Sequence, residues 1–185
     1  KFWDLQENKM LTDFKSVGEE IQNLLWDASN EAILYAYGPQ NVIRVFDARG
    51  PKEAGKIKMG FGLENFAQSP AAPGKLFVSS DDGHIRSVDL GSQKLMSGFD
   101  IKAHESAATS IVCNRSGHLV SNGLDGKAHV WDIKTLSKLA TQETDLGNLF
   151  GSSIHPDSDH LFACGSAKGE VMIWDFTHDI KGDGK

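Results

Sequence analysis

The chain has 185 residues, of which 39% are hydrophobic and 24% are charged, and its formal net charge is −6. That length is enough for one globular domain with a core, and the acidic balance argues against a domain that grips nucleic acid over its whole surface. No stretch approaches the roughly 20 consecutive apolar residues of a membrane-spanning helix, and the first residues lack the pattern of a signal peptide. The two cysteines, Cys113 and Cys164, lie within apolar runs, which favours neither a disulfide framework nor a zinc site and fits a cytosolic or nuclear protein.

A pair of residues, one aromatic or apolar and the next aspartate, recurs along the whole chain. The five pairs are Trp3-Asp4, Phe46-Asp47, Val88-Asp89, Trp131-Asp132 and Trp174-Asp175. Their aspartates are 42 or 43 residues apart, and this regularity indicates structural repeats. Apolar and mostly polar residues alternate just before each pair, as in a half-buried β-strand. The pair therefore marks the end of a strand in every repeat.

Each complete repeat contains three further strands with turns between them. A first short strand ends at a turn signal such as Arg115-Ser116-Gly117, and a second, apolar strand follows at Ala32–Ala36, Leu76–Val78, Leu119–Ser121 and Leu161–Cys164. A hairpin residue that tolerates positive φ then precedes the strand that ends in the pair: Asn41, Gly83, Gly126 or Gly169. After the pair, a polar turn leads to a weaker outer strand such as Lys138–Thr141. The sequence therefore predicts an all-β fold with four antiparallel strands in each repeat and no helix.

Four strands in a period of about 43 residues, closed by Trp-Asp, resemble the blades of the WD-repeat family. The resemblance covers essentially the whole chain and implies a β-propeller of four-stranded antiparallel blades. On this interpretation residues 1–178 form a propeller segment of four to five blades, with blade ends at 4, 47, 89, 132 and 175, and residues 179–185 form a polar C-terminal tail. Closed propellers of this family most often have seven blades. Because the chain opens within a third strand, we expect further blades upstream of Lys1.

The repeat at 103–132 has the family pattern most fully, since Ala103-His104 stands where the family has Gly-His. The resemblance implies that four of its residues form a buried hydrogen-bonded tetrad that locks the blade: His104, Ser121, Asp125 and Trp131. A buried carboxylate and a buried indole N–H both need such partners. In two other repeats the aspartate of this tetrad is replaced by Gln40 and Lys168, so we expect packing to hold those blades.

No pattern in the sequence predicts catalysis or metal binding. The seven histidines include no i,i+2 or i,i+4 pair, there is no Gly-x-Ser-x-Gly elbow, and neither cysteine has a positive neighbour. We therefore expect no catalytic residue, no metal, no cofactor and no small-molecule substrate. Lysines do gather on the expected outer strands, at Lys52, Lys56 and Lys58 and at Lys134 and Lys138. They either protect a sheet edge or contact a phosphate or an acidic partner.

Some segments resemble one family of WD-repeat proteins, that of periodic tryptophan protein 1. The matching features are the Gly-x-Leu-Phe entry within 145–150, the Pro156-Asp157-Ser158 turn and the Lys168-Gly169 hairpin, together with the order of the segments 79–89 and 102–104. This resemblance implies a non-catalytic scaffold of the nucleus and nucleolus that acts in ribosome biogenesis, in large-subunit precursor assembly and rRNA processing. Its partners would be other proteins of a multi-subunit, pre-ribosomal assembly, with any RNA contact indirect or local.

Two other classes of function remain as alternatives. The first is a generic WD-repeat adaptor, such as a chromatin reader or a ubiquitin-ligase substrate receptor, which would bind a peptide on one face. The second is a propeller enzyme, whose signature would be Asp, His or Arg side chains converging around a central channel. The sequence offers no such set, and without an alignment it singles out no partner-binding residue.

Overall fold

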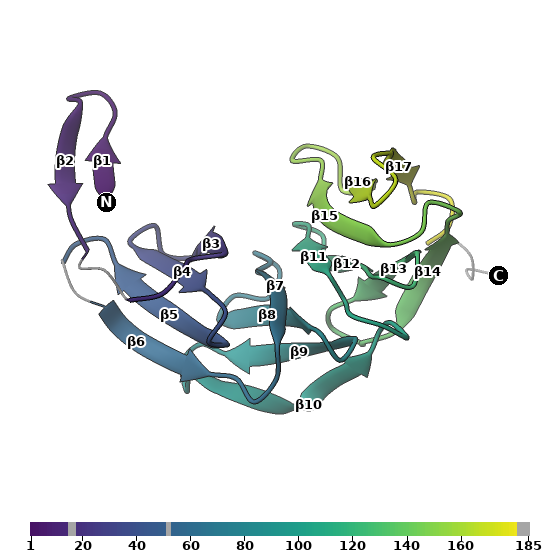
Figure 1. The fold of residues 1–185 in the computed structure, drawn as a ribbon, viewed down its shortest axis with the longest axis horizontal. Helices are drawn as coiled ribbons and strands as arrows, with labels where there is room; N and C mark the ends of the chain where they lie inside the picture. Colours follow the sequence, from purple (N-terminus) through teal and green to yellow (C-terminus); the bar gives the residue numbers. More distant parts are fainter. Residues whose placement is uncertain (15–17, 51–52, 181–185) are drawn as a thin grey trace. The chain divides into compact units, whose positions relative to one another are not determined.

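The computed structural model describes residues 1–14, 18–50 and 53–180. Every regular element in this part of the chain is a β-strand, as the sequence predicts. No helix among these residues is long and apolar enough to cross a membrane. The chain divides into two compact units, Lys1–Leu63 and Glu64–Lys185 (Figure 1).

The first unit contains a two-stranded and a four-stranded antiparallel sheet. β1 (Phe2–Asp4) pairs with β2 (Lys9–Thr12), and the larger sheet has the order β3 (Asn23–Trp26), β4 (Ile33–Tyr37), β5 (Val42–Asp47) and β6 (Glu53–Lys58). Consecutive strands are neighbours, because each short turn returns the chain beside the strand it has just left. The edge-to-face contact between Phe2 and Trp26, with ring centroids 5.8 Å apart, joins the hairpin to the sheet.

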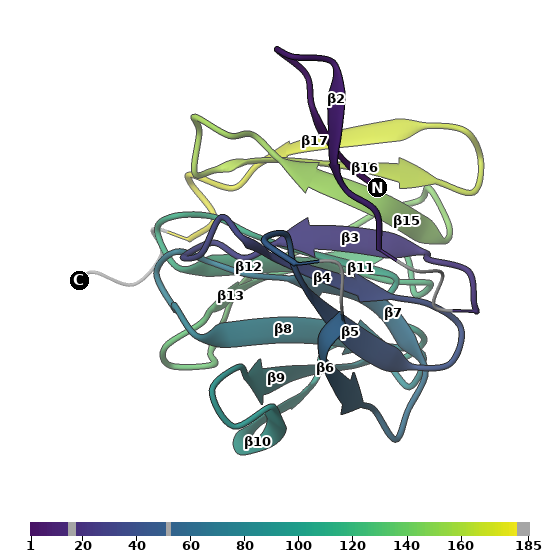
Figure 2. The same cartoon turned by 90° about the vertical axis from the view of Figure 1, so that its left-hand side faces the viewer.

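Three more antiparallel sheets follow, and two of them have four strands. The first has β7 (Leu63–Ala67), β8 (Lys75–Ser80), β9 (His84–Asp89) and β10 (Lys94–Lys102). The second has β11 (Ser110–Cys113), β12 (His118–Asn122), β13 (Lys127–Asp132) and β14 (Lys138–Glu143). The last has only β15 (Leu149–Ile154), β16 (Leu161–Ser166) and β17 (Val171–Asp175), which lie together in Figure 2.

The last two sheets pack face to face. Ala128 and Val130 alternate along β13 and are fully buried in a cluster that includes Phe162, Cys164 and Trp174 of the three-stranded sheet. Side chains at every second position of a strand share a face, so one face of the β11–β14 sheet contributes small aliphatic residues and the facing sheet contributes mostly larger side chains. Ile180, which the sequence assigns to the polar tail, packs against the same cluster. Residues 181–185 lie outside the described part of the chain.

Each repeated aspartate is the last residue of its strand and accepts hydrogen bonds from the turn that follows. Asp132 Oδ1 accepts hydrogen bonds from the backbone N–H groups of Lys134 and Thr135, both at 2.8 Å. The corresponding acceptors are Asp4, Asp47, Asp89 and Asp175, each bonded to a backbone N–H two or three residues further on. An aspartate that bonds the backbone of its own turn makes the chain reverse there, which is why this residue recurs.

The hairpin residues before the third strands have the expected left-handed conformation, with φ of 56°, 79°, 75° and 78° at Asn41, Gly83, Gly126 and Gly169. Their surroundings differ. A Cβ on Gly83 would lie 2.3 Å from the carbonyl oxygen of His104 and 2.4 Å from that of Ser106, whereas a Cβ on Gly169 would meet nothing within 4 Å. Gly83 is therefore required for close approach as well as for its backbone angle.

We expect Gly83→Ala to lower the free energy of unfolding by more than about 3 kcal/mol, because both the backbone angle and the contact with fixed carbonyl groups are unfavourable. The matched variant Gly169→Ala adds only the left-handed strain, about 1 kcal/mol. Urea unfolding followed by tryptophan fluorescence measures both. Equal losses of unfolding free energy in the two variants would mean that the carbonyl groups near Gly83 can move away from an added Cβ without cost.

Candidate functional site

The densest group of buried polar side chains lies in the β11–β14 sheet. Ser121 is on β12, Trp131 is on β13, and Asp125 is in the hairpin that joins these two strands. His104 comes from the segment between β10 and β11. The structure thus brings together all four residues that the sequence groups as a tetrad.

The four side chains form one continuous hydrogen-bonded chain. His104 Nδ1 lies 2.9 Å from Asp125 Oδ1, His104 Nε2 lies 2.9 Å from Ser121 Oγ, and Trp131 Nε1 donates to the same Oγ at 3.0 Å. Asp125 also accepts from the backbone N–H groups of Glu105 and Lys127, at 3.1 and 3.2 Å. The chain therefore ties the segment before β11 to the β12–β13 hairpin.

The carboxylate and the neutral histidine determine which atom donates in each of these bonds. An ionised carboxylate can only accept, so Nδ1 of His104 carries the proton and donates to Asp125. In the neutral ring Nε2 is then unprotonated and accepts from the Ser121 hydroxyl, whose oxygen accepts from the Trp131 indole N–H. A neutral histidine beside an ionised carboxylate satisfies every group in the chain.

The electrostatic surroundings favour the same protonation state. Burial lowers the pKa of His104 despite the opposing influence of Asp125. Burial alone would raise the pKa of Asp125, but His104 and the two backbone N–H donors outweigh it and lower the pKa. Burial also lowers the pKa of the neighbouring His129 to about 4. At neutral pH, His104 and His129 are therefore neutral and Asp125 is ionised.

His129 is the member of this group that the sequence analysis missed. Its ring lies 4.8 Å from that of His104, centroid to centroid, and its Nδ1 is 2.9 Å from Thr141 Oγ1. The cross-strand register gives the reason, since His129 lies directly opposite Ser121. The sequence could have indicated this, because His129 stands two residues before Trp131 and both side chains therefore lie on the same face of β13.

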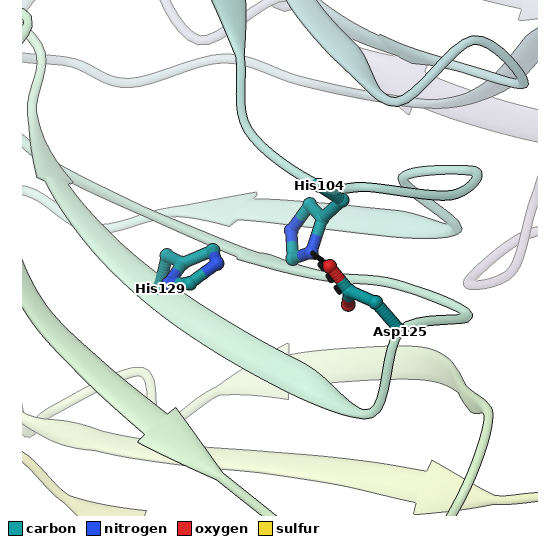
Figure 3. A group of neighbouring side chains, drawn as sticks. All are labelled: His104, Asp125 and His129. Carbon is teal, nitrogen blue, oxygen red and sulfur yellow. Dashed lines mark hydrogen bonds and ion pairs between the residues drawn. The ribbon is translucent and has the colours of Figure 1, made fainter.

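His104, Asp125 and His129 lie close enough together to raise the question of a metal site (Figure 3). A metal needs an unprotonated ring nitrogen with a free lone pair. The only such atom of His104 is Nε2, which already accepts the Ser121 proton. Metal binding would thus break the buried chain and leave Ser121 without an acceptor, so the donor set does not fit an ion.

Two of the sheets that lack a tetrad contain ion pairs at the position of His129. Arg44, on β5, donates to Glu19 Oε1 at 2.7 Å and to Glu53 Oε1 at 2.9 Å. Arg86, on β9, donates to Asp82 Oδ2 at 2.7 Å and to Asp100 Oδ2 at 3.2 Å. The β3–β6 sheet, which the replacement by Gln40 predicts to be held mainly by packing, thus contains a buried ion pair as well.

The remaining chemical candidates belong to different elements of the fold. The thiols of Cys113 and Cys164 have raised pKa values because they are buried, with that of Cys164 at about 11. A cavity of about 500 Å³ in the first unit is lined mainly by apolar side chains, including Phe2, Phe14 and Trp26. Of the lysines noted in the sequence, Lys56 and Lys58 are on β6 and Lys138 begins β14, while Lys52 lies outside the described residues.

We expect Asp125→Ala to cost about 2–3 kcal/mol of unfolding free energy, because His104 and two backbone N–H groups lose a buried acceptor. The control is Gln40→Ala, at the corresponding and exposed position of the first unit, which removes no buried partner. Thermal unfolding compares the two variants. Equal shifts in melting temperature would contradict a locking role for the tetrad.

The buried histidines predict a loss of stability on acidification. Since the pKa of His129 is lower in the folded protein (about 4) than its ordinary value of 6.5, the unfolded chain takes up the proton first as the pH falls. The stabilisation is complete above pH 6.5 and decreases below it, by about 2 kcal/mol at pH 5 from His129 alone. The lowered pKa of His104 acts in the same direction.

Urea unfolding between pH 7.5 and 5 measures this dependence. In His129→Gln the change in unfolding free energy over this range should shrink by about 2 kcal/mol. In His178→Gln, at an exposed position, it should be unchanged. An undiminished pH dependence in His129→Gln would show that His129 titrates normally.

Comparison with known proteins agrees with this architecture. The family model described as "WD domain, G-beta repeat" matches residues 95–132 and 144–175. A crystal structure of the RRP9 WD40 repeats superposes with a TM-score of 0.76 over 88% of this chain and 50% of that one, at 13% identity. That likeness establishes the fold: the sheets are blades of a WD40 β-propeller.

Three curated proteins are similar in sequence. The U3 small nucleolar RNA-associated protein 18 homolog of Arabidopsis thaliana is 29% identical over 76% of this chain, the target of rapamycin complex 1 subunit mip1 of Schizosaccharomyces pombe is 31% identical over 82%, and the DNA damage-binding protein CMR1 of Yarrowia lipolytica is 32% identical over 54%. The chain spans only 24%, 10% and 19% of their lengths. The repeat period, the sheets and these matches together show the fold of a WD40-repeat protein.

Proposed function

We propose that the chain is a non-catalytic protein-interaction scaffold of the nucleolus, acting in ribosome biogenesis as part of a pre-ribosomal assembly. The observation that best supports a scaffold is the internal pairing of the buried polar groups. His104, Asp125, Ser121 and Trp131 bond to one another, and the side chains of Arg44 and Arg86 bond to carboxylates of their own units. These groups hold the sheets and leave recognition to the loops and exposed edges.

The site geometry argues against an enzyme. His104, Asp125 and Ser121 have the hydrogen-bond order of a catalytic triad, yet His104 and Ser121 are buried and Ser121 Oγ accepts a hydrogen bond from the Trp131 indole N–H. A serine nucleophile must be reachable by its substrate. The apolar cavity of the first unit has only Lys1 and Glu19 as charged lining residues, and Glu19 bonds to Arg44.

Two observations support the nucleolar assignment. The first is the set of sequence features shared with the periodic tryptophan protein 1 family, above all the Gly-x-Leu-Phe entry on β15 and the Lys168-Gly169 hairpin. The second is the relative named for its association with U3 small nucleolar RNA. The acidic balance of the chain favours contacts with proteins of such an assembly over extensive contacts with RNA.

The alternative is a WD40 adaptor in another complex. It is favoured by the relatives named as a subunit of target of rapamycin complex 1 and as a DNA damage-binding protein. Since the chain spans a small part of each relative, the same repeats could serve either setting.

Affinity purification of the tagged chain from nuclear extract, with mass spectrometry and RNA sequencing, distinguishes these functions. We expect large-subunit precursor proteins and precursor rRNA, with the proteins retained after ribonuclease treatment because the contacts are with protein. The tetrad variant Asp125→Ala, purified at a temperature where it is unfolded and the unmodified chain is folded, is the control for nonspecific capture by unfolded chain. Recovery of histones, ligase subunits or purely cytosolic partners would overturn the proposal.

A further inference from the structure

The sequence contains a single Asn-Gly dipeptide, and it lies where two sheets meet. Asn122 ends β12, and Gly123 begins the hairpin that leads to β13. The Asn122 side chain is fully buried, and its Nδ2 donates to the Phe150 carbonyl oxygen of β15 at 2.6 Å and to Thr109 Oγ1 at 3.2 Å. Asn122 therefore ties the β11–β14 sheet to the sheet that follows it.

The amide of Asn122 acts in this joint through its nitrogen. Its Oδ1 is buried and has no hydrogen-bond partner among the described residues. The Thr109 hydroxyl donates to the Leu149 carbonyl oxygen at 2.7 Å, so two side chains hold consecutive carbonyl groups of β15. A carboxylate in place of the amide would put an acceptor beside the Phe150 carbonyl oxygen, where a donor is needed.

A different contact requires the glycine. A Cβ on Gly123 would lie 2.7 Å from the Ala107 carbonyl oxygen and 2.8 Å from Cγ and Nδ1 of His104. The tetrad fixes the His104 ring in this place, so no larger residue fits at position 123 without displacing it. Two independent packing requirements therefore place an asparagine directly before a glycine.

Asparagine followed by glycine is prone to spontaneous deamidation, because glycine has no side chain to hinder attack by its backbone nitrogen. The Gly123 nitrogen gives its proton to hydroxide and forms a bond to Cγ of Asn122. The bond from Cγ to Nδ2 breaks, and this nitrogen takes up a proton from water and leaves as ammonia. Water then opens the cyclic imide, which leaves aspartate or isoaspartate at position 122. Water is the only reactant consumed.

The folded hairpin hinders this reaction. The Gly123 N–H donates to the Lys127 carbonyl oxygen at 3.2 Å, and the Gly123 carbonyl oxygen accepts from the Leu149 N–H at 3.1 Å. The leaving nitrogen of Asn122 is held by its two acceptors. The reaction therefore requires the hairpin to open locally, and the tetrad opposes that opening because Asp125 belongs to the same hairpin.

We infer that Asn122 is a deamidation site whose reaction rate is controlled by the tetrad, and that the carboxylate formed there loosens the joint between β12 and β15. The inference goes beyond the scaffold role, since it concerns how long the two sheets stay joined and holds whichever partner the chain binds. Because ammonia leaves, each opening that leads to reaction changes the chain permanently.

The first test incubates the whole chain at neutral pH and follows Asn122 by mass spectrometry of the tryptic peptide 116–127. In the folded chain, the amide should convert to the acid at least about tenfold more slowly than in the chain unfolded in guanidinium chloride. Asn148, which is exposed and precedes leucine, is the internal control and should stay unmodified over the same time.

The second test changes the tetrad. Asp125→Ala, incubated below its unfolding temperature, should speed up the conversion of Asn122 at least about tenfold, because the hairpin opens more often. Trp131→Phe removes only the indole donor and should act in the same direction, which provides a second variant if Asp125→Ala does not fold. Gln40→Ala, the control in the first unit, should leave the rate within about twofold.

The third test reproduces the product with Asn122→Asp. Hydrogen exchange of the β15 amides, Leu149–Ile154, should speed up at least about tenfold, while that of the β9 amides, His84–Asp89, should stay within about twofold. The matched control Gln93→Glu converts an exposed amide to the acid and should leave both sets unchanged.

Four results overturn the inference. These are an Asn122 that stays intact in the unfolded chain, equal conversion rates in the folded and unfolded chain, a rate that the tetrad variants leave unchanged, and an Asn122→Asp chain in which β15 exchanges as before or no faster than β9. The recovery of pre-ribosomal proteins by the unmodified chain depends on none of these results, so the scaffold role is tested separately.

Discussion

The buried hydrogen-bonded chain of the β11–β14 sheet runs from the Trp131 indole, which can only donate, to the Asp125 carboxylate, which can only accept. With a neutral His104 between these two ends, the serine and the histidine each have only one consistent arrangement. The consequence reaches beyond the four side chains. His104 belongs to the segment that enters the sheet, so its two bonds hold that segment against the β12–β13 hairpin and fix the entry loop relative to the strands.

In the other sheets, different residues provide hydrogen-bond partners for the buried polar side chains. The position two residues before the aromatic-Asp pair is arginine in two sheets and histidine in a third. Each of these side chains is largely buried and therefore needs hydrogen-bond partners within its unit. Arg44 and Arg86 each bond to two carboxylates of their own units, and the ring of His129 lies against that of His104 and bonds to Thr141. A repeat can thus keep its backbone geometry while its buried polar residues change. The requirement is that each buried polar group has a hydrogen-bond partner, whichever residues provide it.

Much of this architecture was predictable because it depends on residues close together in the chain. The hairpin residues and the repeated aspartates act on their own turns, so their 42- or 43-residue spacing reveals the strands directly. The partners of Arg44 and Arg86 were not predictable, since Glu19 and Asp100 approach only once the strands are paired. The contact between His104 and His129 needs the register of β12 and β13 as well as the path of the loop before β11. Contacts within a turn can be predicted from the spacing of residues in the sequence, whereas contacts across a sheet become evident only from the folded structure.

The order of strands in each sheet has a consequence for how the molecule forms. Since consecutive strands within each sheet are neighbours, a sheet closes through short loops, and short loops carry a small entropic cost. A chain leaving the ribosome can finish the β7–β10 sheet before the β11–β14 strands are synthesised. Each finished sheet then presents an apolar face, such as that of Ala128 and Val130, on which the next can condense. Folding would proceed from the N-terminus in steps, and at every pause between sheets the nascent chain would have one uncovered face and the greatest need of a chaperone.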